Sequence, residues 1–300
     1  MEHYDIVIIG GGMAGLSAAL YGGWLGRKVF LAERQMFGGQ IVNADQIENY
    51  PGFPDGILGA DLASHVRMQA MKFGARMAYT EITSIKPQAN HFLLESSEES
   101  YEAGAVIVAT GARHRTLGIP GEVELEGKGV SRCATCDGAF FADKGVAVIG
   151  GGDTALDEAL YLTNIVSKVS IIHQNDKPIA SATLVARAKE NPKIEFVRNA
   201  AVEQIIGADA VEGLILSDSS QLPVVGVFLA AGFEAETALL SGIADLDGGG
   251  HALVDLQMQT SVTGLFAVGA ARQGNVGQLA SVAGDGVTAA IAAHRYLQSR

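Results

Sequence analysis

The sequence predicts an α/β protein that contains two Rossmann-like dinucleotide-binding domains. Three observations support this fold class: glycine-rich turns directly after short apolar segments, a repeat of that whole pattern 140 residues later, and a length of 300 residues. Domains usually contain about 100–200 residues, so the chain has room for two. With 48% hydrophobic and 18% charged residues, the chain has the composition of a globular protein with a large core.

The first copy of the repeat covers residues 5–33. An apolar segment at 6–9 predicts a buried strand, and Gly10-x-Gly12-x-x-Gly15 predicts a tight turn into an Ala- and Leu-rich helix. A second apolar segment ends at Glu33. Such glycines allow a pyrophosphate to approach the backbone, the helix N-terminus favours phosphate, and a terminal acid binds a ribose hydroxyl. We therefore expect this copy to bind a dinucleotide.

The second copy, residues 145–173, is less complete. Gly150-x-Gly152-x-x-Ala155 keeps the turn, but His173 stands where the ribose-binding acid would be. No arginine lies within the next ten residues to bind a 2′-phosphate. Either the ligand has been lost or changed while the fold remains, or a second nucleotide site persists. In the latter case its residues are Gly150, Gly152, Asp153, Thr154 and His173.

The only two cysteines stand together in Cys133-Ala-Thr-Cys136, followed by Asp137. Two intervening residues allow a disulfide and lower one thiol pKa, which favours a redox-active dithiol. A zinc site would need two further ligands, and no close pair of histidines is available, so we expect no metal. A flavin is a suitable two-electron donor to a disulfide. Asp137 is the candidate proton carrier, or else a helix cap.

Charge and hydropathy exclude several partner classes. Lys and Arg number 21 and Asp and Glu 33, a net charge of −12, which argues against nucleic acid or an anionic membrane. No apolar stretch reaches the ~20 residues of a membrane span. The first five residues are acidic, unlike those of a signal peptide. We expect a cytoplasmic protein.

Taken together, several segments resemble the low-molecular-weight bacterial thioredoxin reductases over nearly the whole chain. The segments are Gly10–Gly15, Gly38-Gly39-Gln40, Ile47–Phe53, Ala109-Thr110-Gly111, Cys133–Gly138, Gly150–Ala155, Gly264–Gly269 and Gln278–Gly286. The resemblance implies a thioredoxin reductase-like fold, with an FAD-binding domain at 1–114 and 246–300. An inserted NAD(P)-like domain at 115–245 would contain the dithiol.

The resemblance also implies roles for individual residues. Cys136 would face the flavin, Cys133 would exchange with a protein disulfide, and Asp137 would be the acid–base group. Similar proteins are homodimers, and some rotate the inserted domain. FAD would lie along Gly10, Gly12, Ala14, Gly15, Glu33, Gln40, Asn49, Thr110, Gly111, Gly269, Gln278 and Leu279.

Two departures from the family shape the expected function. His173-Gln174-Asn175 replaces the His-Arg-Arg segment of the NADPH-dependent members, and Ala270 replaces an Asp that contacts the flavin. We therefore expect a flavin-dependent disulfide oxidoreductase that reduces a thioredoxin-like protein without NADPH. Electrons would come from ferredoxin or another flavin, and the second glycine turn could hold a further nucleotide or flavin. A basic patch of Arg113, Arg115, Lys128 and Arg132 could dock the ferredoxin.

Three alternatives remain open at this stage. One is a dithiol oxidase that uses oxygen to form disulfides in a small molecule. Another is an NADPH-dependent thioredoxin reductase with an atypical cofactor site. The third is a redox-sensing or binding module without enzymatic activity.

Overall fold

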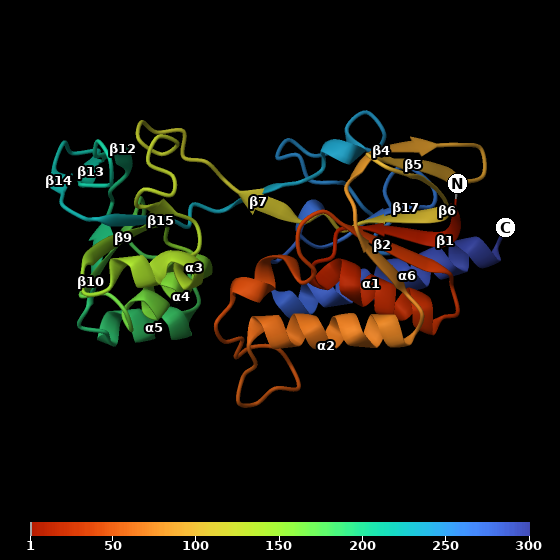
Figure 1. Ribbon diagram of the computed structural model, residues 1–300, viewed down its shortest axis with the longest axis horizontal. Helices are drawn as coiled ribbons and strands as arrows, with labels where there is room; N and C mark the ends of the chain where they lie inside the picture. The colour runs from red at the N-terminus through yellow and green to blue at the C-terminus, as the bar shows by residue number, and fades with distance from the viewer. Residues whose placement is uncertain (1) are drawn as a thin grey trace. The chain divides into compact units, whose positions relative to one another are not determined.

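The computed structural model describes residues 2–300, and these form two compact units (Figure 1). The first unit comprises the chain up to Arg113 together with Glu234–Arg300, and the second is His114–Phe233. The sequence analysis placed the first boundary one residue later, after 114, and the second after 245, which is too late. Residues 234–245 belong to the first unit because Leu240 is buried in its core, with Ile243 packed against the same cluster.

The first unit is built around a seven-stranded sheet in the order β3-β2-β1-β6-β5-β4, with β17 also paired to β6. Strands β1, β2, β3, β6 and β17 run parallel, while β5 is antiparallel to both β4 and β6. The bounds are β1 (Glu2–Ile9), β2 (Val29–Glu33), β3 (Arg76–Tyr79), β4 (Ile82–Pro87), β5 (Phe92–Ser96), β6 (Ser100–Val108) and β17 (Leu265–Ala267).

Three helices cover one face of this sheet: α1 (Met13–Trp24), α2 (Gly59–Lys72) and α6 (Leu279–Gln298). Helices α1 and α6 pack closely at Gly286, where a Cβ would lie 2.1 Å from the carbonyl oxygen of Ala14. Helix α6 can approach α1 this closely only because residue 286 has no side chain. None of the described helices is both long enough and apolar enough to cross a membrane.

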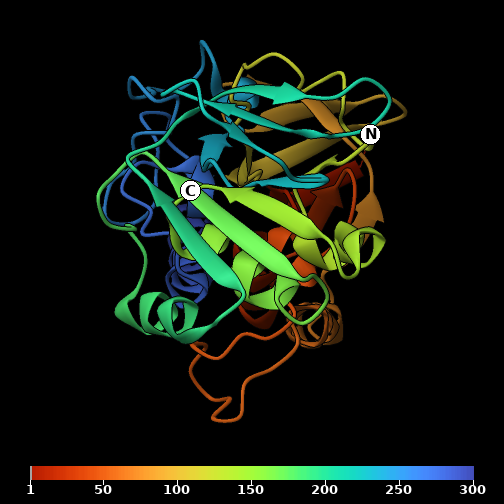
Figure 2. The same cartoon turned by 90° about the vertical axis from the view of Figure 1, so that its left-hand side faces the viewer.

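The second unit contains a five-stranded parallel sheet in the order β11-β10-β9-β15-β8 (Figure 2). Its strands are β8 (Val130–Ser131), β9 (Gly145–Ile149), β10 (Lys168–His173), β11 (Ile194–Arg198) and β15 (Gly226–Leu229). Helices α3 (Ala134–Asp137), α4 (Asp153–Leu162) and α5 (Ala182–Glu190) pack on one face. The other face packs against an antiparallel sheet of β12 (Val202–Ile206), β13 (Gly213–Leu216) and β14 (Gln221–Leu222).

The chain passes between the units twice, through β7 (Ala112–His114) and β16 (Phe233–Ala235). These two short strands pair with each other. The two ends of the second unit therefore lie next to each other in space, although they are far apart in the sequence.

The expected repeat is present as β1-α1-β2 and β9-α4-β10, which confirms the two Rossmann-like units. In both copies the loop after the second strand returns to the glycine turn. The Gly38 N–H donates to the carbonyl of Gly11, and the Ile179 N–H donates to that of Gly151, each at 2.8 Å. The duplication therefore extends beyond the segments that the sequence repeat covers.

Two alanine substitutions in α6 test the packing of this helix on α1. Gly286→Ala should lower the free energy of unfolding by about 1–3 kcal/mol, because the new methyl group overlaps the Ala14 carbonyl. Gly284→Ala is the matched control, since nothing lies within 4 Å of its Cβ position. That control should raise stability by up to about 1 kcal/mol through helix propensity. Urea unfolding measures both, and equal effects would contradict the close approach.

Candidate active site

The first glycine turn combines close packing with open space. A Cβ at Gly10 would lie 2.3 Å from the Ala109 carbonyl oxygen, and one at Gly15 would lie 1.9 Å from the Gly10 carbonyl oxygen. Both positions therefore require glycine to bring the strand against the helix. At Gly12 no atom lies within 4 Å of the Cβ position. This opening at the start of α1 suits a pyrophosphate that approaches the backbone.

Glu33 is fixed at the end of β2 by three backbone groups. Its Oε2 accepts the Gly11 N–H at 2.6 Å, and its Oε1 accepts the N–H groups of Gln35 at 2.7 Å and Met36 at 3.2 Å. A carboxylate has about four lone-pair positions, so capacity remains for ribose hydroxyls. The residues of the first copy thus fit the adenosine and pyrophosphate portions of FAD.

The structure also gathers other residues expected to bind FAD. Asn49 Nδ2 donates to Gln278 Oε1 at 3.1 Å, which joins a loop to the residue before α6. A Cβ at Gly269 would touch the Ala14 methyl group at 3.3 Å. Three more expected residues lie in the same unit: Gln40 donates to the Ala112 carbonyl, Thr110 donates to the Glu236 carbonyl, and Gly111 has open space at its Cβ position. Leu279 begins α6. Their contacts with FAD remain predictions.

Asp285 is a residue that the sequence analysis missed. It is 5% exposed and accepts the Gly269 N–H at 3.1 Å. Arg272 binds the same carboxylate with two nitrogens, Nε at 2.7 Å and a terminal nitrogen at 2.8 Å. A carboxylate from α6 thus lies at the backbone of the residue that precedes Ala270. A signal was available, because Asp285 is the single acidic residue of this helix.

Cys133 and Cys136 form a disulfide in the second unit. Cys133 immediately precedes α3, and its Sγ accepts the Cys136 N–H at 3.2 Å. This hydrogen bond would stabilise a thiolate at Cys133 once the disulfide is reduced. Cys133 is half-buried and Cys136 is exposed. Among the described residues, no cluster of three His, Cys, Asp or Glu side chains has metal-binding geometry.

The Asp137 carboxylate is bound by Ser131. The Ser131 hydroxyl donates to Asp137 Oδ2 at 2.6 Å and accepts the Cys133 N–H at 3.1 Å. Ser131 therefore ties the backbone of one redox cysteine to the carboxylate. The expected acid–base role of Asp137 remains a prediction, and in it Ser131 would hold the carboxylate in place.

Glu158, on α4, is a second carboxylate near the disulfide and was also missed. Its carboxylate accepts the N–H of Ala134, the residue after Cys133. Burial raises the pKa of Glu158 to about 7, the Ala134 N–H lowers it, and the negative charge of Asp157 raises it further. One carboxylate oxygen, Oε2, is buried without a hydrogen-bond partner. This burial is not visible in the sequence, because Asp157-Glu158 resembles an ordinary solvated pair.

The second glycine turn has the same shape as the first. A Cβ at Gly150 would lie 2.2 Å from the Ala230 carbonyl oxygen, whereas Gly152 has open space. Asp153 Oδ1 accepts the Ser181 N–H at 2.6 Å, and this bond holds the loop after β10 over the turn. Thr154 is exposed. The backbone requirements for a phosphate site are therefore retained in this copy.

His173 is only 4% exposed, and its ring lies edge-on to Phe196 at 6.2 Å. Neither ring nitrogen has a hydrogen-bond partner within the described chain. Burial, and next the positive charge of Arg198, lower the pKa of His173. A neutral, buried imidazole at this position supports the shape of the turn more than it offers a contact to a ribose.

Arg198 is the nearby cation that the sequence analysis did not find. It ends β11 and is the register partner of His173, which ends β10. The ten residues that follow His173 in the sequence contain no arginine. Pairing of parallel strands brings an exposed arginine to the same sheet edge from the next strand. The loop after His173, which contains no arginine, therefore lies beside Arg198 from the adjacent strand.

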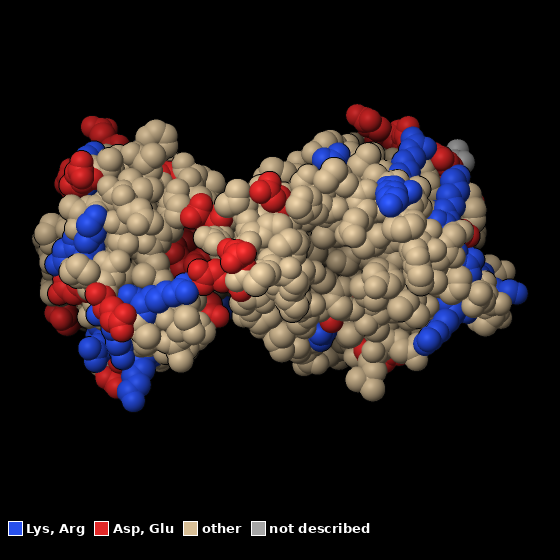
Figure 3. Space-filling model, turned by 90° about the horizontal axis from the view of Figure 1, so that it is seen from below, with Lys and Arg blue, Asp and Glu red and all other residues tan. Residues whose placement is uncertain are grey.

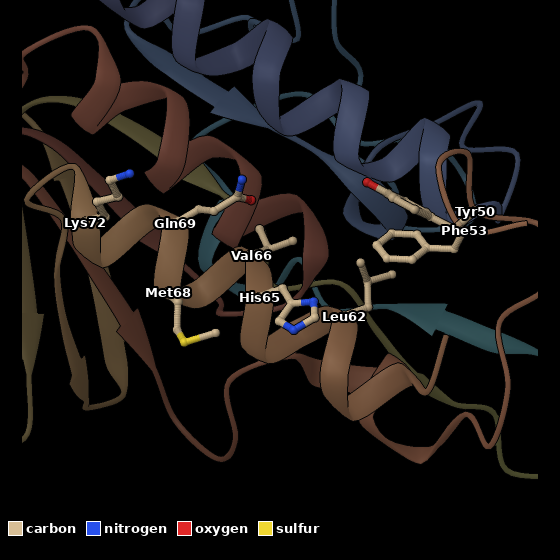
Figure 4. A pocket seen from close by; sticks show the side chains of 8 residues that line it. All are labelled: Tyr50, Phe53, Leu62, His65, Val66, Met68, Gln69 and Lys72. Carbon is tan, nitrogen blue, oxygen red and sulfur yellow. The ribbon is translucent and has the colours of Figure 1, made fainter. Parts of the chain in front are cut away.

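A separate hollow lies in the first unit, between α2 and the loop that contains Tyr50 and Phe53 (Figure 4). It is open, and none of its lining residues is among the predicted FAD or redox residues. The lining side chains are Tyr50, Phe53, Leu62, His65, Val66, Met68, Gln69 and Lys72.

Comparisons with known proteins match the chain over nearly its full length. A model of the pyridine nucleotide-disulphide oxidoreductases matches residues 4–286. The thioredoxin reductase of Listeria monocytogenes is 40% identical over 98% of this chain and 94% of its own. A thioredoxin reductase structure from Lactococcus lactis superposes with a TM-score of 0.96, at 35% identity over 99% and 100% of the two chains. A ferredoxin-flavin thioredoxin reductase from Clostridium acetobutylicum gives 0.56, at 30% identity over both full chains.

The Arg272–Asp285 pair can be tested through stability. Asp285→Asn removes the counter-charge of a half-buried guanidinium and should lower the free energy of unfolding by about 3–5 kcal/mol. Adding Arg272→Met should restore part of the loss, because no unpaired charge then remains. Urea unfolding of the three proteins measures this. An additive double variant would show that the two residues do not act as a pair.

The pH dependence of stability tests the environment of Glu158. Its pKa in the folded protein, about 7, exceeds the ordinary value of 4.5, so the bound proton stabilises the fold. This contribution is complete below about pH 4.5 and is lost as the pH rises through 7. Relative to Glu158→Gln, the wild type should lose on the order of 3 kcal/mol between pH 4.5 and 8. Glu190→Gln, at an exposed site, should show no such trend in urea unfolding.

Proposed function

Since the chain belongs to the thioredoxin reductase family and is thereby an FAD-dependent disulfide oxidoreductase, we propose that its substrate is the disulfide of a thioredoxin-like protein. The observation that supports this most directly is the Cys133–Cys136 disulfide, with Asp137 fixed beside it by Ser131. The names of the relatives support the same class of substrate.

The chain supplies binding, thiol chemistry and proton handling. FAD, when bound, provides the two electrons that reduce the disulfide. Glu33 and the first glycine turn would hold its adenosine and pyrophosphate, and Asp285 would orient Gly269. In the proposed roles, Cys136 receives electrons and Cys133 attacks the substrate disulfide, aided by the Cys136 N–H. Asp137 would exchange protons with the Cys136 sulfur.

The expectation that the electron donor is not NADPH has lost part of its support. Gln174 and Asn175 still favour a donor other than NADPH. Arg198, however, places a cation beside His173 at the edge where a 2′-phosphate would lie. The relatives at 40% identity are named simply thioredoxin reductases, and the ferredoxin-flavin enzyme matches less well. We infer that the donor is NADPH, with a ferredoxin as the alternative that the Gln174-Asn175 loop supports.

Two of the four members of the basic patch expected to dock a ferredoxin form ion pairs within the chain. Arg113 pairs with Glu234 at 3.3 Å, and Arg132 pairs with Glu122 at 2.7 Å and Glu126 at 2.6 Å. Their charges are therefore compensated within the chain. Figure 3 shows basic and acidic side chains lying next to each other on the visible face of the second unit. This mixture gives no support to an acidic protein partner.

Three further expectations remain proposals: a homodimer, a second flavin in the second unit, and a dithiol oxidase activity. Sedimentation at micromolar concentration tests the homodimer. One flavin per chain at saturation would exclude a second flavin in the second unit. Hydrogen peroxide formed in proportion to an added dithiol would indicate the dithiol oxidase rather than the reductase.

Anaerobic mixing of the flavin-loaded protein with NADPH, NADH or reduced ferredoxin tests the donor. We expect NADPH to bleach the flavin absorbance within about one second, near the slow end of typical turnover at ~1–10³ s⁻¹. Reoxidation by added thioredoxin then tests the substrate. Bleaching by reduced ferredoxin alone would restore the NADPH-independent hypothesis. Bleaching without reoxidation by thioredoxin would contradict the proposed substrate.

Arg198→Gln tests the contact with the 2′-phosphate. A charge-assisted hydrogen bond contributes about 1.5–3 kcal/mol, so the NADPH concentration for half-maximal reduction should rise about 10- to 100-fold. The corresponding NADH concentration should not change, because NADH has no 2′-phosphate. Lys189→Gln, on exposed α5, is the matched loss of one positive charge. Equal effects on NADPH and NADH would place Arg198 outside the recognition site.

A further inference from the structure

Glu158, on α4, lies next to the start of α3, the helix that follows Cys133. Helix α3 begins at Ala134, whose side chain packs in the same core cluster as Ala155 and Ala159 of α4. Glu158 lies between Ala155 and Ala159 in the sequence of α4, and its carboxylate accepts the Ala134 N–H. The carboxylate is therefore held at the backbone of the residue that follows Cys133.

The hydrogen bonds of this carboxylate are incomplete. Buried polar atoms in folded proteins almost always have partners, yet Oε2 of Glu158 has none in the described chain. An ionised carboxylate in such a site is destabilised unless a nearby cation compensates it. Of the charged groups, Asp157 is the one that acts on Glu158, and it is also negative. The site therefore favours the neutral acid.

Among the described residues, the charged neighbour that shifts the pKa of Glu158 is Asp157, on the same helix. Helix α3 carries Asp137, which is bound to Ser131. The titratable residues of α3 and the cysteine before it, of α5 and of β10 are Cys133, Cys136, Asp137, Arg187, Lys189, Glu190, Lys168 and His173.

We propose that Glu158 takes up a proton when the Cys133–Cys136 disulfide is reduced, and so makes the redox potential of the dithiol depend on pH. The inference rests on the proposed function, because it requires a redox-active pair. Reduction leaves a thiolate at Cys133, where the Cys136 N–H stabilises it. That new negative charge is on the residue before Ala134, whose N–H the Glu158 carboxylate accepts, so the two charges repel each other unless Glu158 is protonated.

The step balances with glutathione as the reductant. Two glutathione thiols form one glutathione disulfide and release two electrons and two protons. The S–S bond between Cys133 and Cys136 breaks and accepts both electrons. One proton goes to the Cys136 sulfur, the second goes to Glu158, and Cys133 remains a thiolate.

The effect of Glu158→Gln should therefore depend on pH. At pH 5.5 the wild-type carboxyl is already protonated, so the variant and the wild type should have the same equilibrium constant for disulfide reduction. At pH 8.5 the wild-type carboxylate opposes the thiolate, whereas the amide does not. The variant should then be reduced about tenfold more readily, which corresponds to about 30 mV for a two-electron couple.

Titration of the FAD-loaded protein with mixtures of reduced and oxidised glutathione at both pH values measures this constant. Acid quenching followed by thiol alkylation and mass measurement counts reduced cysteines without relying on activity. Glu190→Gln makes the same chemical change at an exposed position and should match the wild type at both pH values. A tenfold difference at pH 8.5 alone would support the proposal.

Two other outcomes have distinct meanings. If wild type and Glu158→Gln titrate alike at pH 8.5, or differ equally at both pH values, proton uptake by Glu158 is excluded and only a packing role remains. If the wild-type pair does not exchange reversibly with glutathione at either pH, the redox-active dithiol of the proposed function fails first. The experiment therefore separates failure of this inference from failure of the proposed function.

Discussion

The fold depends on backbone carbonyls that occupy positions where other residues would have side chains. In the first unit the Gly10 carbonyl fills the Cβ position of Gly15, and in the second the Ala230 carbonyl fills that of Gly150. These contacts bring the end of a central strand against a helix start or a neighbouring strand. Gly12 and Gly152, two residues after Gly10 and Gly150, have open space at their Cβ positions. The same glycine turn thus combines a packing constraint with a surface open to a ligand.

Buried titratable groups in the two units are accommodated in different ways. Asp285 is buried beside Arg272, so its charge is compensated and the pair orients Gly269. Glu158 has a buried carboxylate oxygen without a hydrogen-bond partner among the described residues, and burial raises its pKa to about 7. The ring nitrogens of His173 have no hydrogen-bond partner among the described residues, and burial and Arg198 lower the pKa of this histidine. These differences matter because an unpaired charge that is buried away from water is costly.

The local parts of this molecule could be predicted from its sequence, and the long-range parts could not. The glycine turns, the strand that ends at Glu33 and the cysteine pair are each encoded within a few residues. Arg198 escaped prediction because its relation to His173 arises from strand pairing, across 25 residues of sequence. Asp285 and Glu158 escaped because burial is a property of packing between helices. The domain boundary after 245 was too late because residues 234–245 return to the first unit, and no composition change marks that return.

The pairing of β7 with β16 has a consequence for the history of the chain. Because the second unit begins and ends at adjacent points, its presence adds little to the entropy of closing the first unit's chain. An ancestral single-unit protein could therefore have gained a copy of itself within one surface loop without disturbing the sheet on either side. The shared return of both loops to their glycine turns is what such a gene duplication would leave behind.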